Sequence, residues 1–149
     1  MAVSTLGDYT VPVDGGVWYG CTKAITYAAS TTGEVSAKTI FTVTGTVRVR
    51  LFATVVTALT SGGSSTIEVG TTINTAGIIA QTTSTNLIAG EIYHDATPDS
   101  SVELETVVPT KIVTESIKEK ITTATVTGGA MVYSLLWQPV SADGNVVAA

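Results

Sequence analysis

The sequence is poor in charged residues, with 7 Lys and Arg and 12 Asp and Glu among 149 residues. The net charge of −5 disfavours a surface that neutralises phosphates, so we expect no nucleic-acid partner. Cys21 is the single cysteine, which excludes a disulfide within the chain and a site with several cysteine ligands. No run of about 18 apolar residues occurs, and the N-terminus lacks the pattern of a secretion signal. We therefore expect a soluble chain with no membrane partner.

Motifs for catalysis are also missing. His94 is the single histidine and stands next to Asp95, but neighbouring residues of a strand point to opposite faces. No GxSxG, HExxH or GxxxxGK[ST] pattern occurs. The sequence therefore predicts that the protein is not an enzyme and that His94 is an exposed or half-buried strand residue.

Acidic residues after His94 raise two further possibilities. Glu103 and Glu105, two positions apart in an expected strand, have a spacing near that of the two carboxyl groups of an inverting glycosidase. Any two alternate strand residues share this spacing, so a solvated polar face is the favoured interpretation. Asp95, Asp99 and Glu103 offer oxygen ligands for calcium, but they form no compact acidic loop. We predict no metal and no cofactor.

Threonine and valine are the two commonest residues, and both favour strands. A mean hydropathy of +0.40 together with only 13% charged residues is unusual for a free monomer, because a small domain normally needs a charged surface. A buried subunit interface would explain this composition, so we expect a homo-oligomer. A surface covered mainly by Thr and Ala, without a subunit interface, is the alternative explanation of this composition.

The stretch from residue 38 to 59 has the clearest strand pattern. In residues 47–55 the odd-numbered side chains are all apolar, which is the two-residue period of a strand with one buried face. We expect this segment to be a central strand. Gly45 interrupts the pattern, which indicates either a bend or bulge in one strand or a turn between two strands.

The other segments also predict strands and turns. We expect an extended N-terminal arm (1–16) with a turn at 14–16, and a hairpin loop (60–65) that pairs 66–70 with the central strand. Irregular structure is expected at 71–90, followed by strands at 91–96, 101–107 and within 110–126. After these we expect a hairpin turn (127–130), a core strand (131–137) and a C-terminal tail (139–149). Together they predict an all-β single domain over 1–149, a β-sandwich or jelly roll of roughly eight strands. An Ig-type sandwich is the nearest competitor.

Aromatic side chains are candidates for contacts with other molecules. Trp137 ends the expected core strand, so core packing is the favoured role. Trp18 and Tyr19 follow the expected arm and are our candidate partner interface.

Four segments carry a resemblance to a known family: 41–52, 67–70, 92–98 and 141–145. They resemble small β-rich proteins found among the virion genes of tailed bacteriophages. The resemblance implies a head decoration (cement) protein of jelly-roll type, a homotrimer that binds the major capsid protein of a virion assembled in the host cytoplasm. No site residue carries over from this family.

A glycan- or receptor-binding module of a phage tail fibre or baseplate is the alternative function. Such a module has the same β architecture but uses an exposed aromatic and acidic groove. Tyr93, His94 and Asp95 are the candidate residues for that site.

Overall fold

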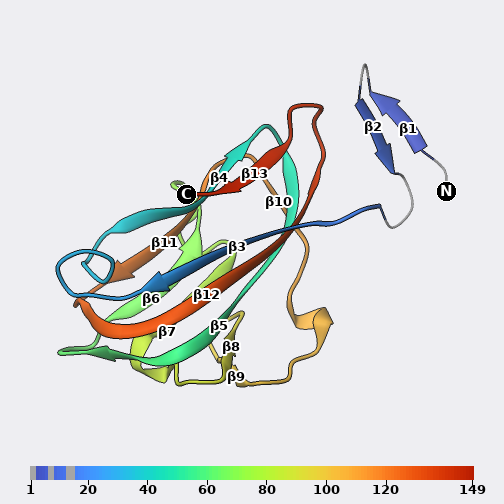
Figure 1. Cartoon of the computed structure of the whole chain (residues 1–149). Helices are drawn as coiled ribbons and strands as arrows, with labels where there is room; N and C mark the ends of the chain where they lie inside the picture. The colour runs from blue at the N-terminus through green and yellow to red at the C-terminus, as the bar shows by residue number, and fades with distance from the viewer. Residues whose placement is uncertain (1–2, 7–8, 13–15) are drawn as a thin grey trace.

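Two antiparallel sheets face each other in the structure. The computed structural model describes residues 3–6, 9–12 and 16–149. The six-stranded sheet has the order β3-β12-β5-β8-β9, with β10 also paired to β5, and the five-stranded sheet has the order β13-β4-β11-β6-β7 (Figure 1). The predicted all-β sandwich is confirmed, although the described residues form thirteen strands rather than about eight.

The bounds of the elements are as follows. The strands of the six-stranded sheet are β3 (Tyr19–Thr26), β5 (Val47–Ser61), β8 (Glu91–Tyr93), β9 (Asp99–Ser100), β10 (Lys111–Val113) and β12 (Val126–Pro139). Those of the five-stranded sheet are β4 (Ala37–Thr44), β6 (Thr66–Gly70), β7 (Ile79–Thr83), β11 (Ile117–Thr122) and β13 (Asn145–Ala148). Two short 3₁₀ helices, η1 (Ser84–Asn86) and η2 (Glu105–Val107), lie in connections. Neither helix of the described chain has the length or hydrophobicity to span a bilayer.

The two longest strands form the centre of the core. β5 and β12 pair over most of their length, with Leu51 opposite Leu135. The predicted alternation of both strands is confirmed: the buried side chains are Val47, Val49, Leu51, Ala53 and Val55 from β5 and Met131, Tyr133, Leu135 and Trp137 from β12. In both strands the residue types favour β structure and the buried side chains stand at every second position, so the sequence pattern predicts the inward-facing residues correctly.

Gly45 stands where the chain passes from one sheet to the other. β4 ends at Thr44 and β5 begins at Val47, so the turn between two strands is the correct one of the two interpretations. The backbone of Gly45 has φ +62°, and a Cβ at this position would clash with the Asp143 carboxylate. A larger residue would need a strained backbone and would displace the side chains of Ser141 and Asp143.

The hairpin expected between the central strand and residues 66–70 is wrong. β6 lies in the five-stranded sheet, between β11 and β7, and does not pair with β5. Both long edges of β5 are already occupied, one by β12 and the other by β8 and β10. The Gly- and Ser-rich connection therefore crosses between the sheets instead of folding back in one of them.

The hairpin turn expected at 127–130 is also wrong. Gly128 and Gly129 lie inside β12, where the register with β5 shifts three times. The backbone of Gly129 has φ +109°, and an added Cβ would lie 2.7 Å from the carbonyl oxygen of Ala58. These glycines form an irregular, bulged part of the strand, while the chain crosses from β11 to the other sheet before them, near Thr123, which has φ +72°.

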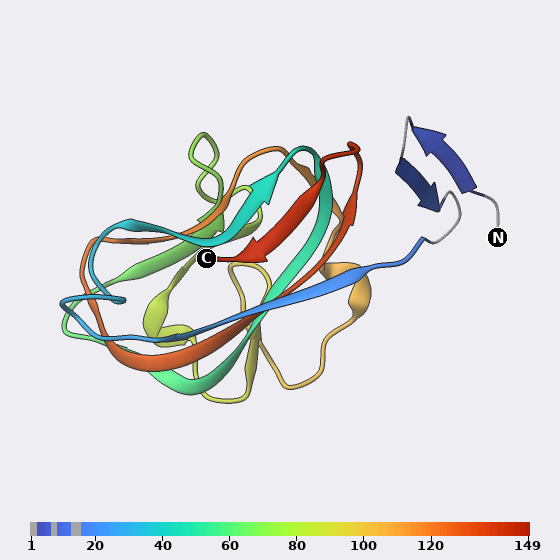
Figure 2. The same cartoon turned by 45° about the horizontal axis from the view of Figure 1, so that its top comes forward.

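Both chain ends differ from the expected arm and tail. Within residues 1–16, β1 (Val3–Leu6) and β2 (Tyr9–Pro12) form a two-stranded antiparallel sheet, which Figures 1 and 2 show beyond the end of the sandwich. Residues 14 and 15 of the expected turn lie outside the described residues. In the expected tail, β13 pairs with β4 and places Val146 in the core. With only four residues, two of them the poor strand formers Asn145 and Ala148, β13 leaves no recognisable strand pattern in the sequence.

Candidate functional site

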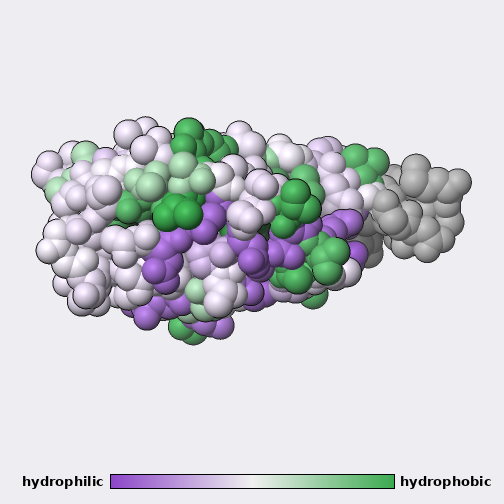
Figure 3. Space-filling model, turned by 90° about the horizontal axis from the view of Figure 1, so that it is seen from below, coloured by the Kyte–Doolittle hydropathy of each residue, from purple (hydrophilic) through white to green (hydrophobic). Residues whose placement is uncertain are grey.

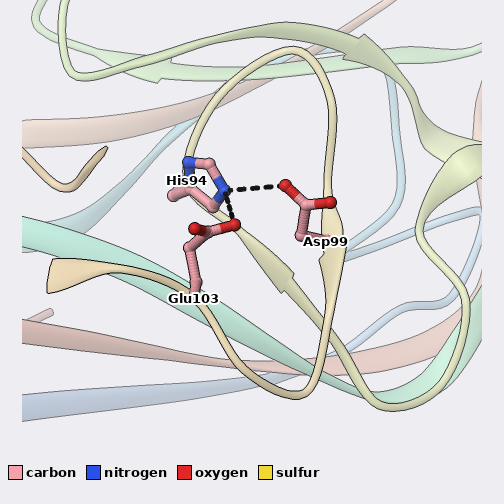
Figure 4. Close-up of side chains that lie close together, drawn as sticks. All are labelled: His94, Asp99 and Glu103. Carbon is pink, nitrogen blue, oxygen red and sulfur yellow. Dashed lines mark ion pairs between the residues drawn. The ribbon is translucent and has the colours of Figure 1, made fainter. Parts of the chain in front are cut away.

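One histidine and two carboxylates meet at the end of the six-stranded sheet. His94 Nε2 lies 3.6 Å from Asp99 Oδ2 and 3.3 Å from Glu103 Oε2. One ligand atom from each of the three residues lies within 4.8 Å of the other two. Figure 4 shows the two carboxylates approaching the same ring nitrogen from different parts of one loop. We call these three residues the His94 cluster.

Strand pairing brings the first two members together. β8 pairs with β5, with Tyr93 opposite Ala53, so His94 leaves the sheet directly after a buried residue. β9 pairs with β8, with Asp99 opposite Ile92, and this returns the chain beside His94. This pairing could not be predicted, because a two-residue strand leaves no periodic signal in the sequence.

The third member, Glu103, belongs to a segment that was predicted wrongly. Residues 101–104 form no strand, and the apolar side chains Val102 and Leu104 are 81% and 70% exposed. The side chain of Glu103 is only 17% exposed and faces His94. Glu105 is instead 82% exposed and pairs with Arg50, whereas Glu103 faces His94. The regular strand spacing from which the glycosidase-like pair was inferred is therefore absent.

His94 is buried, contrary to the prediction of an exposed or half-buried residue. Its side chain is 2% exposed, and neither ring nitrogen has a hydrogen-bond partner within the described part of the chain. Asp95 Oδ2 lies 3.6 Å from Nδ1, on the side of the ring away from the cluster. Asp95 Oδ1 accepts hydrogen bonds from the backbone N–H and the hydroxyl of Thr97, at 2.6 and 2.9 Å. Thr97 thus holds the Asp95 carboxylate in place beside the ring.

The two carboxyl groups of the cluster influence each other. A hydrogen bond with Glu103 raises the pKa of the Asp99 carboxyl. The backbone N–H of Leu104 donates to Glu103 Oε1 at 2.7 Å and lowers the pKa of Glu103. Close carboxylates repel unless a proton or a cation lies between them. The cluster is therefore a place that favours a bound positive charge.

Tyr93 does not have the position that the glycan-binding interpretation requires. It is completely buried, and its hydroxyl donates to the carbonyl oxygens of Ile67 at 2.9 Å and Ala80 at 3.0 Å. The expectation of an exposed Tyr93 is wrong, because the ring fills the space between the sheets and offers no face to a sugar. Of the three residues proposed for that site, His94 is also buried and only Asp95 reaches the surface.

Trp18 and Tyr19 lie at the beginning of the edge strand β3. Tyr19 is half-exposed and Trp18 is partly buried. The ring of Tyr19 stacks on that of Trp137, with centroids 4.9 Å apart and an angle of 31° between the planes. Trp137 is buried, as predicted. Tyr19 therefore extends the core of the sandwich to its surface.

An apolar groove lies on the outer face of the six-stranded sheet. It has a volume of about 250 Å³ and is bordered by Arg50 and Glu105 at one side. Its apolar lining consists of Phe52, Ile92, Leu104, Val108 and Leu136. Seen from below, the molecular surface is largely pale, with green hydrophobic patches beside purple hydrophilic side chains (Figure 3).

A buried acidic group in the core was not predicted. Glu119 of β11 is 2% exposed, and its Oε2 accepts hydrogen bonds from Tyr27 at 2.5 Å and Tyr133 at 2.6 Å. Burial raises the pKa of Glu119 and of both tyrosines. The alternation of β11 places position 119 inward, but a glutamate in a sequence normally indicates an exposed position.

A comparison with solved structures finds similarity to a chain of the acidic stable capsid structure of Helicobacter pylori bacteriophage KHP30. The match covers 88% of this chain and 93% of that chain, with a TM-score of 0.49 and 10% sequence identity. No protein-family model and no curated protein sequence matches the chain.

Proposed function

We propose that this chain is a structural, non-enzymatic virion protein of the capsid decoration type, which stabilises a phage head through protein–protein contacts. The observation that carries the proposal is the apolar groove on the outside of the six-stranded sheet. The sequence resemblance to small virion proteins of tailed phages suggests that the chain acts in a virion, and the apolar groove suggests that it acts by binding other proteins.

The groove has the chemistry of a protein interface. Leu104 is 70% exposed and Leu136 is 39% exposed, although each is large and apolar. Taking a leucine side chain from fully exposed to fully buried is worth about 1.5–3 kcal/mol, and covering the exposed part of each of these two side chains contributes a fraction of that. The neighbouring Arg50–Glu105 pair supplies a polar rim, which orients a partner without filling the groove.

The edge strand β3 offers a second contact. It is paired only with β12, so its other backbone edge is free of strand partners among the described residues. Tyr19 stands at the start of this edge, half-exposed and supported by Trp137. An aromatic side chain with a rigid support beside an open strand edge is suited to contact a neighbouring subunit.

The proposed partners are the major capsid protein and two further copies of this chain. The groove is assigned to the capsid protein and the β3 edge to the contacts within the trimer. Because the two contacts lie on different surfaces, a substitution can weaken one of them and leave the other unchanged. Charged residues are few, so forming either contact removes few charged groups from water and the desolvation cost is small.

Co-sedimentation with capsid particles tests the proposal. Particles are assembled from the major capsid protein encoded in the same genome and mixed with the purified chain. Wild-type chain is expected to sediment with particles in a saturable manner, and Leu104→Asp is expected to weaken binding at least tenfold. Ile73→Asp changes a residue that is 86% exposed and does not line the groove, and is the matched control. Chain that stays in the supernatant at all concentrations, or equal binding by both variants, would contradict the proposal.

A further inference from the structure

We propose that His94, Asp99 and Glu103 bind a divalent transition-metal ion of the zinc type. The site lies in the connection between β8 and η2 and shares Glu103 with the wall of the apolar groove. The sequence alone does not predict this metal site. Its acidic residues Asp95, Asp99 and Glu103 suggest only oxygen ligands for calcium, and they form no compact acidic loop.

The two distances from the imidazole nitrogen to the carboxylates are those expected between ligands of one ion. Two donors bound to a tetrahedral ion, each about 2.0–2.2 Å from the metal, lie about 3.3–3.6 Å apart. His94 Nε2 lies 3.3 Å from Glu103 Oε2 and 3.6 Å from Asp99 Oδ2. A single Nε2–H points in one direction and serves one carboxylate, whereas an ion between the three donors satisfies all of them.

The buried histidine is the second, independent observation. Its side chain is 2% exposed, and both ring nitrogens are without hydrogen-bond partners in the described part of the chain. A buried polar group without a hydrogen-bond partner is costly, so burial of the imidazole in this position favours a bound ligand. Nε2 is directed at the two carboxylates (Figure 4).

Asp95 has the position of a supporting residue. Its Oδ2 lies 3.6 Å from His94 Nδ1, opposite the cluster, and Thr97 fixes its other oxygen. Histidine ligands commonly donate their second N–H to a carboxylate, which fixes the tautomer that leaves Nε2 free for the metal. Asp95 is therefore a positioning residue and contributes no ligand.

The donor set selects the class of ion. Calcium and magnesium prefer oxygen ligands, whereas an imidazole nitrogen with two carboxylates suits zinc and its first-row neighbours. Three protein ligands leave further positions to water, since the side chain of Asp99 is 58% exposed. The ion would tie both carboxylates of the loop to the end of β8. Because Glu103 and Leu104 also line the apolar groove, the ion would order one wall of that groove.

Zinc binding by the purified full chain tests the inference. The chain is stripped with a chelator and titrated with Zn²⁺ in a calorimeter, and bound metal is counted by mass spectrometry after dialysis. Wild type is expected to bind one ion per chain and to melt at a higher temperature with zinc. Co²⁺ is expected to give a visible absorption band from the same site.

Variants separate the site from adventitious binding. Asp99→Asn/Glu103→Gln is expected to weaken zinc binding at least 100-fold and to remove both the cobalt band and the zinc-dependent rise in melting temperature. Asp95→Asn is expected to weaken binding about tenfold. Glu91→Gln, on β8 but outside the cluster, is expected to bind as wild type does. Metal-free circular dichroism shows whether each variant is folded. Absence of stoichiometric binding by wild type, or binding that a folded Asp99→Asn/Glu103→Gln variant retains, would overturn the inference.

Discussion

Tyr133 and Glu119 join the two sheets of the sandwich through a buried hydrogen bond. The hydroxyl of Tyr133 on β12 donates to Glu119 Oε2 on β11 at 2.6 Å, and Tyr27 donates to the same oxygen at 2.5 Å. β11 and β12 follow each other in the chain but belong to different sheets. This contact therefore ties the two layers together across the core.

Tyr133→Phe removes one hydrogen bond to the buried carboxylate. We expect the free energy of unfolding to fall by about 1.5–3 kcal/mol, because the hydrogen bond involves a group that is costly to leave unsatisfied. Urea denaturation measures the change. Tyr19→Phe, on a half-exposed ring, is the control and is expected to change stability by less than about 0.5 kcal/mol. Equal effects of the two substitutions would show that the Glu119 contact is not important for stability.

Glu119 also predicts a pH dependence. Burial raises its pKa in the folded protein above the ordinary value of 4.5, so the folded state holds this proton more tightly than the unfolded state does. The contribution of Glu119 to stability is therefore fully present below pH 4.5 and is lost as the pH rises through the folded-state pKa. We expect the difference in unfolding free energy between wild type and Glu119→Gln to shift in favour of wild type as the pH falls. Denaturation of both proteins from pH 4 to 8 measures this difference, and a constant difference would contradict the assignment.

Gly129 has a backbone conformation that other residues rarely adopt. Gly129→Ala is expected to lower the unfolding free energy by about 1–3 kcal/mol, because φ is +109° and the new Cβ would meet the backbone of Ala58. Gly62→Ala is the control, since a Cβ added at Gly62 would have no neighbouring atom within 4 Å. That substitution is expected to be neutral or stabilising by up to about 1 kcal/mol. Thermal denaturation of the two variants compares them, and a loss of stability at Gly62 alone would contradict the bulge in β12.

Tyr19 is predicted to act in assembly more than in folding. Tyr19→Ala removes the stacking on Trp137 and is expected to lower the unfolding free energy of the chain by about 0.5–1.5 kcal/mol. If the β3 edge joins copies of the chain, the same substitution also shifts the oligomer toward monomer. Sedimentation velocity measures the oligomer. Thr22→Ala, an exposed position in the middle of β3, is the control for the strand itself. Unchanged assembly of Tyr19→Ala would remove Tyr19 from the proposed interface.

The strength of the sequence pattern determined which parts of the fold were predictable. β5 and β12 are long and buried on one side, so their alternation identified the inward residues correctly. Glycines were misleading, because Gly128 and Gly129 mark a bulge inside a strand and not a hairpin. Strand partners were also not predictable, since the connection at 62–65 has the composition of a hairpin loop but crosses between sheets.

The candidate metal site was harder to predict from the sequence than the fold was. His94 and Asp99 are brought together by β9, which is only two residues long, and Glu103 by a loop whose apolar residues face outward. Tyr93 looked like a surface aromatic because it stands next to two polar residues, yet its hydroxyl is satisfied by two carbonyl groups in the core. In each case long-range contacts, rather than local preference, decide the position of the side chain.

Cryo-electron microscopy of capsid particles shows whether the chain occupies regular positions on a phage head. Particles of the major capsid protein encoded in the same genome are imaged with and without the purified chain. We expect added density at regular positions on the outer surface, in groups of three, with the six-stranded sheet and its groove facing the shell. Particles that are identical in both samples at saturating concentrations of the chain would contradict this expectation.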